Sequence, residues 1–436
     1  MADLSRRDFT RLLALSGSLS LFPGTLLAER SGKKGLRLED LGLTDAAMPP
    51  TPAIPDERFW KEVRSRFLVP PDLGFMNAAN LCPTSLPVVK ELDKNTRTYD
   101  ANPSQSVRTE LTHGREAART QLAAALRVKP EEIVITRNTS EGNNMISTGL
   151  NLGPNDEVLV FSDNHPSNMN AWHVKAKRFG FTVSSVQQVT PHPGTEYYVD
   201  AFRKAITPRT RVVAVTHVSS NDGALFPVNE ICALARESGA LSLVDGAQSC
   251  GVLDVDLSAM RPDFYTGSSH KWPCGPKEIG VLFVAQAVQD QLMPSVISLY
   301  AGAVGASRTL EAYGQRDDAA LAAFSAALKF QDDIGRDVIE RRSRDLAQHM
   351  MTGLKAIDGV TLYTVPERSA AIVIFKPGSL DPRKLGAALL ENDKIVCTSR
   401  AGADRPGLRF SPHFYNTMDE IDRSVAAIKR YVAAGV

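Results

Sequence analysis

The stretch LSLVDGAQ at residues 241–248, together with SSHK at residues 268–271, decides the fold of this chain. Each stretch contains or follows a short apolar run that ends in polar residues, which is the pattern of a buried strand. Parallel strands bring their carboxyl ends to one edge of a sheet, where α/β folds bind ligands. We therefore expect Asp245 and Lys271, at two neighbouring strand ends, to share one crevice.

Short strands and longer helical stretches alternate along most of the chain, which predicts an α/β fold with a largely parallel sheet. A long amphipathic helix is expected at 317–355, and a smaller strand–helix unit follows it. This pattern predicts a large domain at 59–310 and a connecting helix with a small C-terminal domain at 311–436. The expected strands of the large domain lie at 132–135, 158–161, 182–186, 212–218, 241–245, 263–267 and 280–284.

The composition is that of an ordinary globular protein, with 43% hydrophobic and 23% charged residues among 436. It excludes a disordered chain, a collagen-like rod and a multispan membrane protein. Fifty Lys and Arg against 49 Asp and Glu give a formal charge of +1, so no basic excess favours nucleic-acid binding. The five cysteines are scattered and form no CxxC pair. We therefore expect neither a disulfide framework nor a metal site.

The first 30 residues have the pattern of an export leader. Arg6 and Arg7 precede a mildly apolar stretch at 12–28, which is too short and too polar to span a bilayer. The paired arginines, with Phe9 two positions after Arg7, resemble the bacterial twin-arginine signal and predict a periplasmic protein. A proline-rich linker is expected at 31–58. The alternative is a disordered leader on a cytoplasmic protein.

Asp245 and Lys271 are the pair of residues that pyridoxal phosphate requires. The cofactor needs a lysine amine to form a Schiff base and an acid that keeps its pyridine nitrogen protonated, so that the ring withdraws electrons. Each residue alone has a plainer interpretation, because a strand-end Asp often caps a turn and a single Lys is often solvated. A cofactor site also needs contacts to the phosphate and to the ring.

Two other segments supply such contacts. The strand EEIVIT runs into a helix start at 137–142, where the Thr139 and Ser140 hydroxyls and free backbone N–H groups would bind a phosphate. An ordinary helix N-cap is the alternative. His165 follows another strand and, as a neutral imidazole, would stack on the ring, although a single His is often a loop residue.

Five motifs stand in the order seen in class V aminotransferase-fold pyridoxal-phosphate enzymes. They are TRNTSEGNN, NHPSNMNAW, HVSSNDG, VDGAQ and SSHK, and the resemblance covers roughly residues 70–430. The chain resembles cysteine desulfurases, kynureninase and, most closely, isopenicillin N epimerase-like proteins. The resemblance implies a fold type I pyridoxal-phosphate transferase with an amino-acid substrate.

The resemblance also assigns roles to the residues around the cofactor. Lys271 is implied to form the Schiff base, Asp245 to bind the ring nitrogen and His165 to stack on the ring. Gln248 and Ser220 are implied to contact the phenolic oxygen. The implied phosphate ligands are Thr139, Ser140, Ser268 and His270.

Further residues are implied at the edge of the site. Arg409, in GLRFSPHFYN, suits a bidentate contact with an α-carboxylate, and Asn77 lies where an N-terminal loop covers the substrate. Asn221 stands beside Ser220, and which of the two faces the cofactor is open. The loop YGQRDDAAL at 313–321 resembles one that reaches the phosphate of a neighbouring subunit, which implies a homodimer with a shared active site. Its Gln315 stands where Thr is common, so the Gly314 backbone is an alternative contact.

The type of reaction is narrowed by one missing residue. Cysteine desulfurases carry a nucleophilic Cys after an Arg-x-Gly motif, whereas SRAGADR at 399–405 has none and Cys397 lies upstream. A persulfide route is therefore not expected. Transamination, epimerisation and β-elimination, including C–S lyase activity, stay open, each with Lys271 as general base at the α-carbon. A non-catalytic exported binding protein is a further alternative, against which the retained Lys271 and Asp245 argue.

Overall fold

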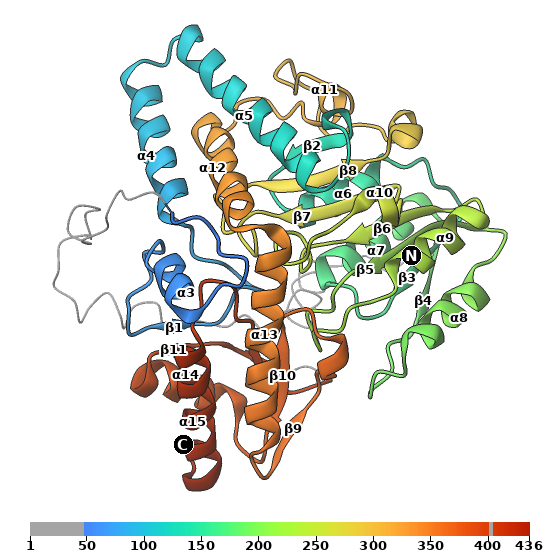
Figure 1. Ribbon diagram of the computed structural model, residues 1–436. Coiled ribbons are helices and arrows are strands. Elements are labelled where there is room, and N and C mark those ends of the chain that lie inside the picture. Colours follow the sequence, from blue (N-terminus) through green and yellow to red (C-terminus); the bar gives the residue numbers. More distant parts are fainter. Residues whose placement is uncertain (1–47, 401–403) are drawn as a thin grey trace, which may run out of the picture.

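The computed structural model describes residues 48–400 and 404–436 (Figure 1). The expected leader at 1–30 and most of the expected linker at 31–58 lie outside this part of the chain. None of the helices within it is long and apolar enough to cross a membrane.

A seven-stranded sheet forms the centre of the large domain, in the order β2-β8-β7-β6-β5-β3-β4. Neighbouring strands from β7 to β4 run parallel, whereas β8 is antiparallel to both β2 and β7. The prediction of an α/β fold with a mainly parallel sheet is confirmed. The strands are β2 (Ile133–Thr136), β3 (Glu157–Phe161), β4 (Thr182–Val186), β5 (Thr210–Thr216), β6 (Leu241–Asp245), β7 (Phe264–Ser268) and β8 (Gly280–Val284).

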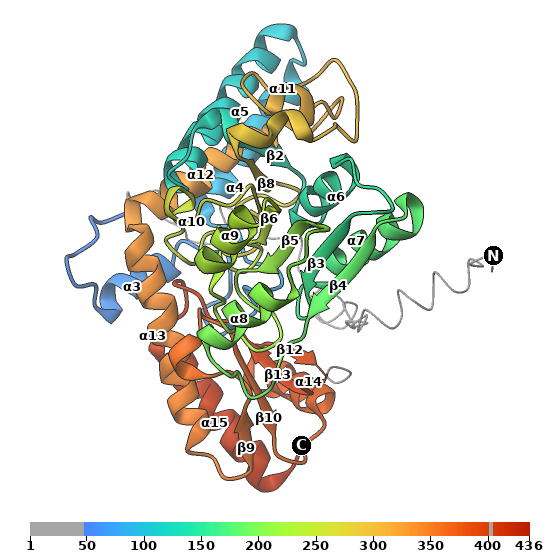
Figure 2. The same cartoon turned by 90° about the vertical axis from the view of Figure 1, so that its right-hand side faces the viewer.

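Helices cover both faces of this sheet, as the apolar strands require (Figure 2). In β3, Val158 and Val160 pack into one hydrophobic cluster with Trp172 of α7, whereas Leu159 and Phe161 pack into another. Successive side chains of a strand point to opposite faces, so an unbroken apolar run fits a strand that is buried on both sides. The helices of the large domain include α4 (Leu86–Ala101), α5 (Gln105–Ala125), α6 (Thr139–Gly149), α7 (Pro166–Phe179), α8 (Thr195–Ala205), α9 (Val228–Glu237), α10 (Leu257–Met260) and α11 (Ser307–Leu310).

The prediction of a single connecting helix at 317–355 is wrong. Two helices occupy this stretch, α12 (Asp318–Ile334) and α13 (Arg336–Lys355). They meet at Gly335, which has φ +98°, a conformation that favours glycine and ends the α-helical hydrogen bonding. The break lets α12 pack on α5 and α4 while α13 packs on α15 (Met418–Ala434).

The C-terminal elements build a smaller sheet with a hydrophobic cluster of its own. Its order is β12-β13-β10-β9, and all three neighbouring pairs are antiparallel. A short parallel pair, β1 (Gly74–Phe75) with β11 (Ile395–Val396), ties the segment after α3 (Glu57–Arg64) to this region. The remaining elements are β9 (Val360–Leu362), β10 (Val373–Pro377), α14 (Pro382–Asp393), β12 (Thr398–Arg400) and β13 (Gly407–Phe410).

Candidate active site

Asp245 is the last residue of β6 and is 2% exposed. Its Oδ2 accepts hydrogen bonds from Asn143 Nδ2 at 2.9 Å and from Asn168 Nδ2 at 3.4 Å, and its Oδ1 accepts from the Ala247 N–H. A buried carboxylate is stable only when such donors satisfy it. These donors fix its orientation at the carboxyl end of the sheet, where a protonated ring nitrogen would find an anion.

Lys271 lies three residues after β7, and β7 is the parallel neighbour of β6. Burial lowers the pKa of its amine to about 8, and the positive charge of Arg409 adds to this effect while Asp245 opposes it. About a tenth of the amine is then neutral at pH 7, far more than for an ordinary lysine, and the neutral form is the one that attacks an aldehyde. The charges of Asp245 and Lys271 act on each other, so the two residues lie close together at the ends of neighbouring strands.

The expected phosphate-binding residues Thr139, Ser140 and Ser268 lie where α6 begins beside the end of β7, and we call this place the phosphate cradle. The Thr139 backbone N–H donates to Ser268 Oγ at 2.9 Å, and the two hydroxyls of these residues lie 2.7 Å apart. A Cβ on Gly142 would lie 2.9 Å from Thr266 Cγ2, so this glycine lets α6 approach β7 closely. Ser140 lies in the same first helical turn, and a helix start with hydroxyls is suited to a phosphate dianion.

Two histidines next to Lys271 are neutral near pH 7. His165 caps α7, and its Nδ1 accepts from the Ser167 backbone N–H at 3.2 Å, which places the ring proton on Nε2. Burial and then the charge of Lys271 lower its pKa to about 4, although part of the side chain stays open to solvent. Burial and Lys271 likewise lower the pKa of His270 to about 4. A neutral imidazole suits ring stacking for His165 and hydrogen bonding to a phosphate for His270.

The structure distinguishes Ser220 from Asn221 as candidates for the cofactor contact. The Asn221 amide donates to Asp163 Oδ1 at 2.7 Å and accepts from Arg400, so both of its ends are engaged. In the described part of the chain the Ser220 hydroxyl has no hydrogen-bond partner, which leaves it the better candidate for a cofactor contact. Gln248 is buried between the Ala79 carbonyl and the Trp272 indole N–H, and its amide keeps one N–H for a ligand.

Arg409 in β13 is buried, and it lies close enough to Lys271 for its charge to lower the pKa of that lysine. Its Nη1 donates only a long 3.4 Å hydrogen bond to the Ser220 carbonyl, and its buried Nε has no protein partner among the described residues. Burial and then the charge of Arg400 lower its pKa to about 9. Asn77 lies nearby, because it bridges to Ser411 and accepts from Thr398 Oγ1 at 2.6 Å. A buried guanidinium without a carboxylate is a binding group for an anionic ligand.

The loop at 313–321 approaches the cradle within its own chain. Arg316 donates from Nη1 to the Ile135 carbonyl at 2.6 Å, and Gln315 accepts from Arg108. Gly314 has φ +82°, a conformation that favours glycine. The role expected for this loop at a neighbour's phosphate stays a prediction.

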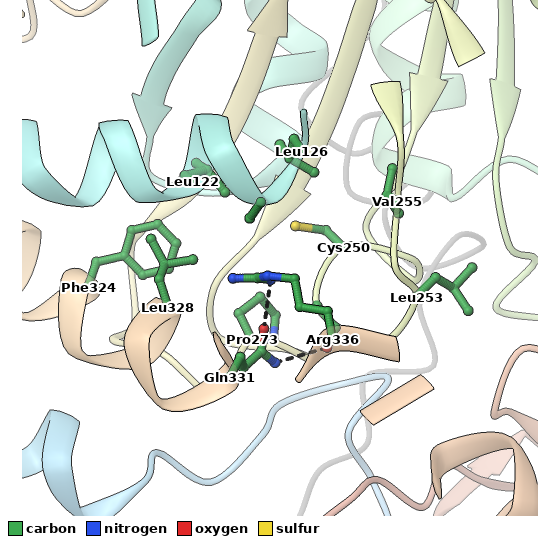
Figure 3. A pocket seen from close by; sticks show the side chains of 12 residues that line it. Leu122, Leu126, Cys250, Leu253, Val255, Pro273, Phe324, Leu328, Gln331 and Arg336 are labelled. Atoms are coloured by element: carbon green, nitrogen blue, oxygen red, sulfur yellow. Dashed lines mark hydrogen bonds between the residues drawn. The ribbon is translucent and has the colours of Figure 1, made fainter. Parts of the chain in front are cut away.

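A small apolar pocket behind the lysine loop encloses only about 10 Å³ and is too small for a substrate (Figure 3). At its wall Gln331 donates to the carbonyls of Gly251 and Trp272, each at 2.9 Å, and accepts from Arg336. His413 donates to the same Trp272 carbonyl at 2.7 Å. These bonds fix the backbone that directly follows Lys271.

The sequence interpretation missed the residues that hold the cofactor-facing groups in place. Asn143 and Asn168 orient Asp245, and Thr266 in turn donates to Asn143 at 3.0 Å. Asn143 and Asn168 are within the quoted motifs, one helical turn after Thr139 and three residues after His165. Their position on the inner side of α6 and α7 was the available signal.

Fold and site together define a pyridoxal-phosphate enzyme of fold type I. The chain belongs to the aminotransferase class-V family, whose model matches residues 75–423. The residues fit the cofactor, since an oriented carboxylate, a lysine with lowered pKa and a helix-start cradle surround one crevice.

Known relatives of this chain carry more than one activity. It is 29% identical to an isopenicillin N epimerase of Amycolatopsis lactamdurans over 85% of this chain and 98% of the relative. It is also 29% identical to a probable cysteine desulfurase of Halalkalibacterium halodurans, over 82% and 93% of the two chains. The solved structure of the cysteine desulfurase CsdA of Escherichia coli superposes with a TM-score of 0.78 at 25% identity, covering 88% of this chain and all of that one.

Proposed function

We propose that this enzyme transfers a proton at the α-carbon of an amino acid, as an epimerase or an aminotransferase. The observation that carries the proposal is the buried Arg409 guanidinium, which has no carboxylate partner among the described residues and whose charge acts on Lys271. A substrate with a carboxylate next to an amine would satisfy both groups. Simple amines would leave Arg409 buried and unpaired, which is unfavourable.

Pyridoxal phosphate, when bound, supplies an electron sink for the charge that develops at the α-carbon. Asp245 would hold the ring nitrogen protonated, and the cradle at Thr139 and Ser268 would bind the phosphate. Arg409 binds the substrate carboxylate and so fixes one end of the amino acid. Lys271, with a pKa of about 8, accepts the α-proton and returns it, because its amine is close to half neutral at a slightly alkaline pH.

A β-eliminating C–S lyase is the second candidate, and it is supported by relatives that are named cysteine desulfurases. Cys397 is a poor sulfur acceptor, because burial raises its pKa to about 12 and the thiolate is the nucleophile. The positions at 401–403, where the missing cysteine was noted, lie outside the described residues. An elimination would therefore have to release sulfide without a protein persulfide.

The test is a screen of L- and D-amino acids in D₂O with product analysis. Loss of the α-proton signal with inversion identifies an epimerase. Transfer of the amino group to an added keto acid, without release of ammonia, identifies an aminotransferase. Release of ammonia and pyruvate, together with sulfide from cysteine or with cysteine persulfide from cystine, identifies the lyase. If wild-type enzyme exchanges no α-proton of any amino acid while a Lys271→Ala control behaves identically, the proposal fails.

We propose further that the active enzyme is a homodimer. Support comes from a run of exposed apolar side chains between β8 and α11, of which Ile297 is 88% and Leu299 is 95% exposed. Such a run on one segment favours a protein interface, and a second copy of this chain is the occupant that would also complete the phosphate site. Ile297→Asp with Leu299→Asp should give monomers in light scattering and weaker cofactor retention. Val174→Asp, at a site 54% exposed on α7, is the control, and dimers in both variants would refute the interface.

We propose that the enzyme is exported, in its folded and cofactor-loaded state, by the twin-arginine route. The support is the Arg6-Arg7 pair together with a cofactor that has to be inserted during folding. Fractionation of cells expressing the intact chain and an Arg6→Lys, Arg7→Lys variant tests this. Equal cytoplasmic retention of both forms would favour a cytoplasmic enzyme with a leader.

A further inference from the structure

Three buried charged residues join the segment before β13 to two loops of the large domain. Arg405 donates from Nη2 to Asp163 Oδ1 at 2.5 Å and from Nη1 to Asp222 Oδ2 at 2.7 Å. The three side chains are between 4% and 7% exposed. Buried ion clusters of this kind add little net stability compared with apolar packing, so the position of the cluster is its informative property.

The two carboxylates lie on the loops that face the cofactor crevice. Asp163 follows β3 and precedes His165 by two residues, whereas Asp222 follows β5 and is two residues after Ser220. Arg405 is therefore the shared partner of the loop that carries the ring-stacking histidine and the loop that carries the Ser220 hydroxyl.

Additional hydrogen bonds connect the two loops to each other and to β13, the strand that carries Arg409. Asp163 accepts from the Ser219 hydroxyl and from Asn221 Nδ2 at 2.7 Å. The Ser220 carbonyl accepts from Arg409 Nη1 and from Arg400 Nη1, each at 3.4 Å. A shift of the Ser220 loop would therefore move the carbonyl against which Arg409 is placed.

We propose that Arg405 is a positioning residue. By binding both Asp163 and Asp222, it keeps the His165 and Ser220 loops in a fixed position relative to Arg409. The proposal rests on the proposed function in that it assigns the site an amino-acid carboxylate. The planar fork of arginine reaches two carboxylates at once, and a lysine in its place offers a single point charge. Loss of the fork would loosen both loops without removing any group that touches the substrate.

The decisive variant is Arg405→Lys in the cofactor-loaded enzyme. We expect faster hydrogen–deuterium exchange in peptides covering 162–168 and 217–226, and at least a tenfold higher KM for an amino acid with kcat within threefold of wild type. The matched control is Arg64→Met, which removes another arginine, with a side chain 11% exposed, that pairs with Glu420 at 3.2 Å, between α3 and α15. It should lower Tm without changing either readout.

The outcomes separate this proposal from the proposed function. Unchanged exchange in both peptides, or the same change in Arg64→Met, overturns the positioning role. If amino acids prove not to be substrates, the exchange experiment still decides, because it needs no substrate. If Arg405→Lys does not fold, Asp222→Asn replaces it, because this variant keeps the side-chain size and removes one of the two carboxylates. Faster exchange of the 217–226 peptide in this variant then supports the proposal, and unchanged exchange refutes it.

Discussion

Replacing Arg409 by Met should separate substrate binding from stability. The guanidinium is 6% exposed, makes one 3.4 Å hydrogen bond and has a buried Nε without a partner among the described residues. Met keeps an apolar stem of similar length, and the Ser220 carbonyl retains its bond from Arg400. Because no carboxylate of residues 48–400 and 404–436 loses a partner, we expect Tm of the substrate-free enzyme to be unchanged or higher.

The size of the binding effect follows from the burial of this charge. Arginine stays protonated in proteins, so a pKa lowered from 12.5 to about 9 means that the surroundings disfavour the charged form by up to about 5 kcal/mol. A bound carboxylate relieves this penalty. Truncating one partner of such a buried pair weakens binding by about 2–5 kcal/mol, which is about thirtyfold to several thousandfold. Arg409→Lys should recover the charge but not the fork, with about a tenfold loss remaining.

The assay is a titration of the cofactor absorbance with an amino acid and with the corresponding amine lacking the carboxylate. In wild type the amino acid should bind far more tightly than the amine, and in Arg409→Met the two affinities should converge. An amino-acid affinity within threefold of wild type would refute the carboxylate contact. A fall in Tm of several degrees would show instead that the guanidinium has a structural partner.

Three further predictions concern the cofactor and its lysine. Borohydride reduction of the purified enzyme followed by peptide mapping should place the cofactor on Lys271, and an adduct on another residue would contradict the assignment. Asp245→Asn should leave Tm within a few degrees of wild type and reduce kcat far more than substrate affinity, because the amide no longer holds the ring nitrogen protonated; near wild-type turnover would mean that Asp245 only caps its strand. Cofactor loading of the apoenzyme should accelerate as pH rises through about 8, because the lowered pKa of Lys271 makes its neutral, reactive form dominant above that pH. A rate that keeps rising towards pH 10 would indicate an unperturbed lysine.

The strands and the central pair of the site could be predicted from the sequence because both are local patterns. Apolar runs such as VLVF at 158–161 admit few structures other than buried strands, and the sheet then brings their polar end residues together. The break between α12 and α13 was missed, since Gly335 interrupts an otherwise continuous amphipathic pattern and a single glycine is tolerated within a helix.

The supporting residues could not be predicted for a different reason. Arg405 and Asp163 are 242 positions apart in the chain, and a sequence pattern gives no indication that the segment before β13 of the small sheet meets the loop after β3 of the large sheet. Asn143 and Asn168 stand within the quoted motifs, but their partner Asp245 is about a hundred residues from the first of them. Long-range polar contacts of this kind depend on the packing of whole elements.

The crevice combines three basic groups whose pKa values are all lowered by burial: Lys271, His165 and Arg409. The charged forms of Lys271 and Arg409 are disfavoured in the substrate-free protein because both groups are kept from water, whereas His165 stays neutral and partly open to solvent. Each of the three groups is matched by what an amino acid or a phosphorylated aldehyde brings. The neutral imidazole offers a face to a ring, the partly neutral amine attacks a carbonyl carbon, and the unpaired guanidinium takes a carboxylate. The charge of Asp245 acts on both Lys271 and His165, and the hydrogen bonds from Asn143 and Asn168 orient its carboxylate for a protonated ring nitrogen. The arrangement therefore fits a ligand pair with one cationic ring and one free carboxylate, which is the combination that the proposed α-carbon chemistry on an amino acid requires.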